Sequence, residues 1–161
     1  MNNECKSRSS NLLLWLGSFA ILLTLAMPAF AALGGDLSSV ESDRVHMKAQ
    51  ISITPAGPYS VHVIKSDLKT TVREYVSPSG RVFAVAWNGP FMPDMKQILG
   101  TYFQQYSSGA QTVRSSRPGR HPFSLQVPGL VVENSGHMRF YVGRAYDPGL
   151  LPSGVTADAI R

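Results

Sequence analysis

The chain has 161 residues, of which 43% are hydrophobic and 16% are charged, and it carries a formal net charge of +5 and one cysteine. A single cysteine excludes an internal disulfide. The mildly basic charge favours anionic partners such as acidic glycans or phosphorylated lipids, although it also serves simple solubility, and we expect no nucleic-acid partner.

Residues 1–31 have the organisation of an export signal. Two basic residues precede an uncharged apolar run over residues 12–26, and Ala29 and Ala31 place small side chains at the two positions that signal peptidase recognises. We therefore expect cleavage between Ala31 and Ala32. An uncleaved membrane anchor is the alternative, but a run of about 15 apolar residues is shorter than the roughly 20 that a spanning helix needs.

Cleavage would leave 130 residues, a length that suits one self-sufficient domain. It would remove Lys6, Arg8 and Glu4, so that 13 basic and 9 acidic residues remain, a net charge of +4. Cys5 would be lost as well, so the mature chain could form no disulfide, thiolate metal site or cysteine nucleophile. We expect a periplasmic or secreted protein that is stabilised by packing alone and has no membrane span after cleavage.

The first half of the mature chain predicts a helix followed by an antiparallel meander. The helix is expected over residues 36–50, where Ser38 and Glu41 have the spacing of a capping box. Turn residues separate four strands that we expect at 50–54, 59–65, 70–76 and 81–87. The last of these strands is apolar nearly throughout, which indicates a central strand covered on both faces.

The second half predicts one amphipathic helix and a closing hairpin. After Asp94 as N-cap, apolar residues recur with helical spacing at positions 95, 98, 99, 102, 103 and 106. A polar loop is expected over 107–122, then strands at 130–133 and 137–146 around a turn at 134–136, and an irregular tail from about 147. Residues 32–161 should thus form a single α+β domain, an antiparallel sheet of about five to six strands with two helices packed on one face.

Several blocks of this chain are distinctive. The longest, 73–90, reads Arg-Glu-Tyr-Val-Ser-Pro-Ser-Gly-Arg-Val-Phe-Ala-Val-Ala-Trp-Asn-Gly-Pro, and shorter ones occupy 32–35, 93–95, 99–103, 136–139 and 143–146. With these blocks the chain resembles the exported bacterial proteins grouped as domain-of-unknown-function family 2844, over essentially all of residues 32–161. The resemblance implies a small envelope or secreted bacterial protein, and it brings no established activity, ligand or catalytic residue.

The sequence shows no strong signature of catalysis or metal binding. Its four histidines are far apart, and the Asp43–His46 pair offers two ligands where zinc needs three or four, so we expect no metal and no cofactor. The segment 66–69 matches Ser-x-x-Lys but falls in an expected turn, and no nucleophile elbow or phosphate loop occurs. The sequence therefore favours a protein that is not an enzyme. A hydrolase with His62 or His137 as general base stays open as an alternative.

Two groups of residues could form a binding surface. The first is the arginine cluster Arg114, Arg117 and Arg120 in the expected loop, because arginine forks bind phosphate or carboxylate; a solvated connection is the simpler interpretation.

The second group lies on the closing hairpin, where strict alternation would point His137, Arg139 and Tyr141 outward and Met138, Phe140 and Val142 inward. Such a cationic and aromatic ladder suits a sugar or an acidic group, although an ordinary solvated sheet face has the same pattern. Arg144 and Trp87 could extend the surface if they share one concavity with Arg139, although Trp87 also suits the core.

These features support three hypotheses. The leading one is a non-enzymatic envelope binding or accessory protein for an anionic glycan, lipid or protein partner. The second is a subunit of an envelope assembly that pairs through an exposed sheet edge. The third is the hydrolase.

Overall fold

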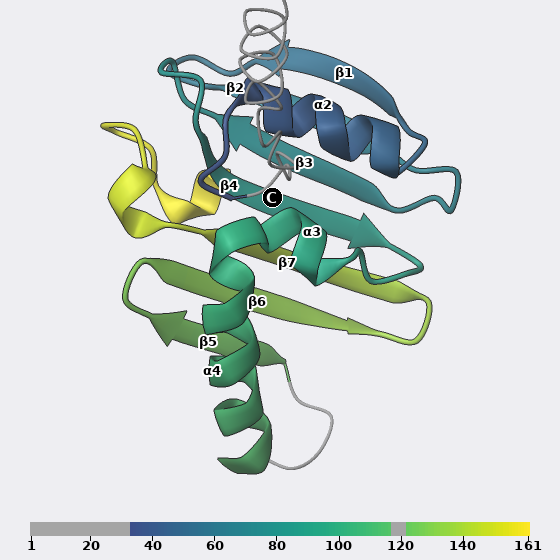
Figure 1. The fold of residues 1–161 in the computed structure, drawn as a ribbon, viewed down its shortest axis with the longest axis vertical. Coiled ribbons are helices and arrows are strands. Elements are labelled where there is room, and N and C mark those ends of the chain that lie inside the picture. The colour runs from purple at the N-terminus through teal and green to yellow at the C-terminus, as the bar shows by residue number, and fades with distance from the viewer. Residues whose placement is uncertain (1–32, 117–121) are drawn as a thin grey trace, which may run out of the picture.

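The computed structural model describes residues 33–116 and 122–161 (Figure 1). These residues form a seven-stranded sheet of order β1-β2-β3-β4-β7-β6-β5, in which all neighbouring strands are antiparallel. The strands are β1 (Gln50–Pro55), β2 (Ser60–Lys65), β3 (Thr71–Val76), β4 (Val82–Gly89), β5 (Phe123–Val127), β6 (Leu130–His137) and β7 (Phe140–Tyr146). The predicted α+β class is confirmed, with seven strands where five to six were expected.

The helices lie on one face of the sheet (Figure 1), as predicted. They are α2 (Leu37–His46), α3 (Met95–Leu99) and α4 (Phe103–Ser116), with a single 3-10 turn η1 (Gly100–Tyr102) between the last two. Their apolar side chains meet those of the sheet in one core, which includes Val40, Ile98, Ile64, Val72 and Trp87. Burial of this face is the main stabilising contribution that the sequence pattern anticipates.

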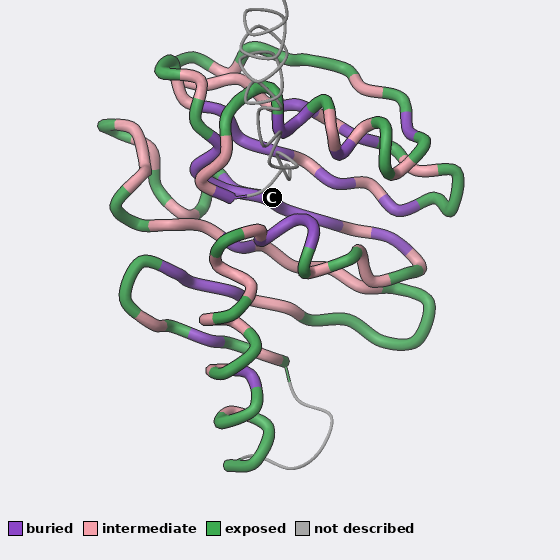
Figure 2. The backbone as a smooth tube through the Cα atoms, viewed as in Figure 1, coloured by how far each residue is buried: buried purple, intermediate pink, exposed green. Residues whose placement is uncertain are grey.

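The other face of the sheet is covered only in part, by the tail that follows β7. The tail contains two single 3-10 turns, η2 (Pro148–Leu150) and η3 (Ala157–Ala159). It packs on a second cluster in which Ile160 contacts the layer of Tyr75 and Phe83. The part of this face over β5, β6 and the start of β7 lies beyond the tail and is largely exposed or half-buried (Figure 2).

Two local predictions about the helices are wrong. Asp36, not Ser38, caps α2, since its carboxylate accepts the N–H groups of Ser38 and Ser39. The polar segment expected as a loop over 107–122 is helical as far as Ser116, as part of α4. Tertiary contact outweighs the weak helix propensity of this segment, because α4 packs on β5, a strand that the sequence analysis missed.

The predicted turn of the closing hairpin is also wrong. β6 continues through 134–136 to His137, and the turn falls at Met138 and Arg139. Gly136 is required for a different reason: its φ is 125°, and a Cβ there would lie 2.0 Å from the carbonyl oxygen of Phe140.

The export signal that we predict over residues 1–31, and Ala32 after it, lie outside the described residues. Within 33–116 and 122–161, no helix is long and apolar enough to cross a membrane.

Candidate functional site

A groove of about 470 Å³ opens on the tail-bearing face of the sheet, between the end of the tail and strands β5, β6 and β7. Val142 and Gly143 of β7 contribute to its lining. Polar side chains around it come from β5, β6, β7 and the tail. They are Ser124, Glu133, Ser135, Arg144 and Arg161.

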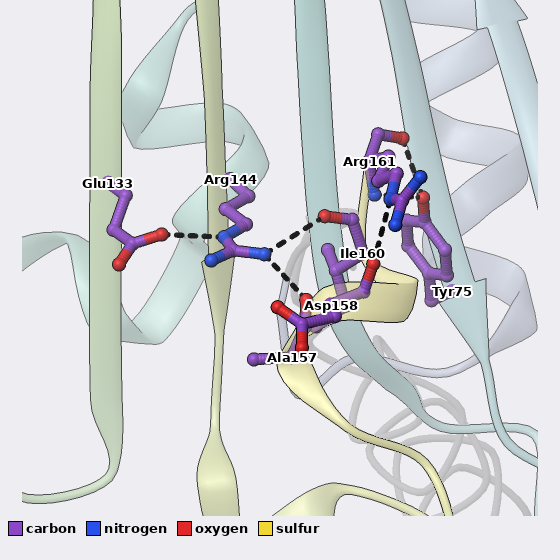
Figure 3. A network of polar contacts seen from close by, with 7 residues as sticks. All are labelled: Tyr75, Glu133, Arg144, Ala157, Asp158, Ile160 and Arg161. Atoms are coloured by element: carbon purple, nitrogen blue, oxygen red, sulfur yellow. Dashed lines mark hydrogen bonds and ion pairs between the residues drawn. The ribbon is translucent and has the colours of Figure 1, made fainter.

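Arg144 is the central side chain of this groove, and its guanidinium connects the sheet to the tail (Figure 3). Its Nε donates to Glu133 Oε2 on β6 at 2.6 Å. Its Nη1 donates to the carbonyl oxygens of Ala157 at 2.6 Å and Ile160 at 3.3 Å. Three bonds fix the plane of the guanidinium, while Nη2 has no hydrogen bond to any described residue and can donate to an anionic ligand.

The tail contributes Arg161 to the lining of the groove. Tyr75 on β3 fixes the end of the tail, since its hydroxyl donates to the carbonyl oxygen of Arg161 at 2.7 Å and accepts the Arg161 N–H at 2.8 Å (Figure 3). Arg161 Nε in turn donates to the carbonyl oxygen of Asp158. With the hydroxyls of Ser124 and Ser135 on the opposite wall, the groove offers positive charge and neutral hydrogen-bonding groups together.

Trp87, Arg139 and Arg144, which the sequence suggested could share one concavity, lie apart in the structure. Trp87 is 1% exposed and lies in the core on the helix face, where its ring packs directly over Gly143. Arg144 lies on the opposite face, and Arg139 is exposed in the hairpin turn with a φ of 67°. Of these three residues, only Arg144 lines the groove.

The predicted ladder on the closing hairpin is wrong, because the shifted turn changes the strand faces. His137 pairs with Phe140, and their rings stack with centroids 5.6 Å apart. Tyr141 pairs with Gly136 and therefore faces the helix side of the sheet, opposite to His137. Met138 and Phe140, which were expected to point inward, are exposed.

The arginine cluster is only partly described. Arg114 is exposed on the last turn of α4, whereas Arg117 and Arg120 lie outside the described residues. Its role stays a prediction.

The two histidines considered as general bases do not line the groove. His62 is buried on the helix face of β2, where its Nε2 lies 3.1 Å from Ser60 Oγ and burial lowers its pKa. His137 lies on the hairpin, with its Nδ1 3.1 Å from the carbonyl oxygen of Met138. Across the part of the chain that the structure describes, no three His, Cys, Asp or Glu side chains could hold a metal ion together.

A pair of buried carboxyl groups between α2 and β3 was not predicted from the sequence. Asp43 and Glu74 are both buried, and Gln97 of α3 donates from its amide to Asp43 Oδ1 at 2.5 Å. Burial raises the pKa of Asp43 to about 6, and burial together with the neighbouring Asp43 carboxyl raises the pKa of Glu74 well above its usual range. The strand alternation was the available signal, since it places Glu74 on the same face as Val72 and Val76.

An antiparallel sheet with helices on one face and a polar groove on the other defines a small α+β domain. Within that class, the chain belongs to the family described as protein of unknown function DUF2844, whose model matches residues 29–160. The resemblance found in the sequence is thereby confirmed. No curated protein and no solved structure matches the chain.

Proposed function

We propose that this protein is exported to the bacterial envelope and acts there as a non-enzymatic binding protein, holding an acidic glycan in the groove beside Arg144. The observation that carries the proposal is the fixed guanidinium of Arg144, which keeps one nitrogen for a ligand. Arginine held in this way binds carboxylate groups with defined geometry, and the serine hydroxyls nearby suit the hydroxyl groups of a sugar.

Binding fits the groove better than catalysis does. Among the described residues that line it, the only side-chain carboxylate is that of Glu133, which already accepts from Arg144 at 2.6 Å. A general base needs a free carboxylate or imidazole within hydrogen-bond reach of the substrate. Among the described lining residues, the groove provides charge and hydrogen-bonding groups, and none of these side chains is a free base placed to take a proton.

The first described residue is compatible with the proposed cleavage. Leu33 is 1% exposed, and its N–H donates to the carbonyl oxygen of Ile98 at 3.1 Å. The described core therefore includes the second residue after the proposed cleavage site, so a product that begins at Ala32 would keep every core residue that the structure describes.

Charge-matched variants test the groove. On a polygalacturonate column, we expect R144Q to elute at clearly lower salt than the wild type, because a ligand carboxylate loses its main partner. E133Q breaks the same ion pair but keeps the arginine, so it should elute at equal or higher salt. R44Q removes an arginine that pairs with Glu41 on α2, far from the groove, and should elute close to the wild type.

Equal elution of R144Q and R44Q would show that only net charge matters and would contradict the proposal. So would loss of retention in R114A/R117A/R120A with unchanged retention in R144Q, since the ligand surface would then be the arginine cluster. A column of uncharged dextran should retain none of these proteins.

A second candidate function rests on strand β1. This strand forms one edge of the sheet, and five of its six residues are exposed. An exposed edge offers unpaired backbone groups to a strand from a partner protein. The N–H of Ile53 faces this edge, because Ile53 and His62 form a pair without hydrogen bonds to each other. Proline at Ile53 would remove that N–H, and cross-linking in envelope extracts should then lose any partner that binds there.

A further inference from the structure

One end of the sheet carries an unusual set of apolar side chains at loop tips. The chain connections at this end, which we call the loop rim, are residues 47–49, 66–70, 90–94 and 138–139. Figure 1 shows these connections side by side along one edge of the molecule. Four of the large hydrophobic side chains that are exposed lie there: Leu68 (65%), Phe91 (55%), Met138 (74%) and Phe140 (49%), the last at the start of β7.

The turns at the opposite end of the sheet differ in composition. They comprise residues 56–59, 77–81 and 128–129, are built from Pro, Gly, Ser and Tyr with single Ala and Arg residues, and contain none of the exposed large hydrophobic side chains. Single exposed apolar residues are common on any protein, but a set on one rim marks an interaction site.

The loop rim holds these side chains in place. Thr70 Oγ1 donates to the carbonyl oxygen of Phe91 at 3.0 Å and so joins two of the loops. Gly89 beside them has a φ of 159°, and a Cβ there would lie 2.6 Å from the Cα of Thr70, so the backbones are in close contact. Phe140 stacks on His137. The apolar tips are thus displayed on a packed framework.

Basic side chains accompany the apolar tips. Lys48, Lys65, Lys69 and Arg139 are exposed on the same connections or the strand ends that enter them. The acidic residues there are fewer: Asp67 is exposed, and Asp94 caps α3 by accepting the N–H groups of Lys96 and Gln97. Cations interleaved with Phe, Leu and Met form the pattern by which proteins rest on the headgroup layer of an anionic bilayer.

We propose that the loop rim docks this protein on an anionic lipid bilayer, with Leu68, Phe91, Met138 and Phe140 inserted among the headgroups and the basic side chains against the phosphates. The four apolar side chains lie at the ends of five neighbouring strands, β2, β3, β4, β7 and β6, which at a spacing of about 4.8 Å extend over about 20 Å. A lipid surface is deformable, so it can accommodate four separate apolar side chains spread over this distance. A second copy of this chain would place the same four cations against one another.

This docking surface is distinct from the groove. Arg144 and the tail lie on one face of the sheet, whereas the rim lies at the strand ends. The bilayer would therefore leave the groove open to a glycan, and each site can be tested without the other.

Vesicle sedimentation tests the proposal. The protein used is the product that cells accumulate when they express all 161 residues. We expect the wild type to sediment with vesicles of phosphatidylcholine and phosphatidylglycerol in equal amounts, and weakly with phosphatidylcholine alone. F91S/M138S should lower the partition coefficient at least about tenfold, because two inserted side chains are lost. K65E/K69E should lower it as well and reduce its dependence on salt.

The matched control is L37S/I53S, which removes two side chains of similar exposure away from the rim. Every variant keeps the same N-terminus as the wild type, so a retained leader would affect all of them equally. Equal partition of F91S/M138S and L37S/I53S would overturn the proposal. Retention of the wild type on polyglutamate without sedimentation on phosphatidylglycerol vesicles would also overturn it, in favour of an acidic protein partner. R144Q should sediment like the wild type.

Discussion

At the scale of single residues, Glu74 and Asp43 make the stability of this protein depend on pH. Both pKa values are raised in the fold, by burial first, so the folded chain holds protons that the unfolded chain releases near pH 4. Their stabilising contribution is therefore complete below about pH 4 and is lost as the pH rises through about 6 and beyond.

Glu74→Gln replaces one of these groups by a neutral side chain of the same shape. We expect the variant to be more stable than the wild type at pH 8, and by a smaller margin at pH 5, as measured by urea unfolding. Parallel changes in the two proteins between these pH values would contradict the expectation. Glu41→Gln, an exposed carboxylate on the helix that carries Asp43, serves as the control.

Other titratable groups lie near Asp43 and Glu74. Comparing the wild type with Glu74→Gln cancels their effect on stability. His62 lies opposite Glu74 on β2, and its lowered pKa acts in the other direction, because its contribution is lost as the pH falls. His46 and Asp94 act on Asp43 with opposite signs. All of them are present in both proteins, so the difference between wild type and Glu74→Gln reports Glu74.

At the scale of elements, the tail from 147 to 161 depends on few contacts and should loosen on its own. Ile160 is 1% exposed against Tyr75 and Phe83, and Ile160→Ala should cost about 2–4 kcal/mol of tail docking. Tyr75→Phe removes the hydroxyl that bonds twice to Arg161 and should cost about 1–2 kcal/mol. Hydrogen exchange should then show lost protection in the tail while amides of β4 and α2 stay protected. A uniform loss across the chain would show instead that the tail is part of the global core.

The elements that the sequence predicts well are those whose own pattern decides them. The four strands of the meander occur within about two residues of their expected ends, because alternation and turn residues specify them locally. The end of α4 and the strand β5 depend on each other, since Tyr106 packs on Phe123 and a Cβ at Gly109 would lie 2.6 Å from Leu125. The weakly helical segment 107–116 carries no such information by itself.

The candidate site, too, depends on information that the local sequence pattern does not contain, namely the register of the β6–β7 hairpin. A hairpin turning at 134–136 would set Glu133 opposite His137, whereas the turn at Met138 and Arg139 sets it opposite Arg144. Arg144 could be named from the sequence as a surface arginine. Its ion pair, and the carbonyl groups that the tail brings to it, follow only from the register and the folded tail.

At the scale of the whole molecule, the proposed division of the sequence into a leader and a folded body predicts how cells process the chain. Cells that express the complete chain should accumulate outside the cytoplasm a product that begins at Ala32 and lacks Cys5, identified by mass spectrometry and by its failure to react with maleimide. The reason is local, because small residues at Ala29 and Ala31 meet the requirement of signal peptidase.

A pair of variants separates processing from folding. Ala31→Asp should block cleavage, so that a precursor longer by 31 residues stays with the membrane fraction. Ala32→Ser lies one residue past the proposed site and should be processed like the wild type. Because Leu33 is already buried in the core, cleavage at this site requires an extended chain and should precede folding of the body. A wild-type product that keeps Met1 in the cytosol would contradict the export proposal and, with it, the envelope setting in which an acidic glycan and an anionic bilayer are available together.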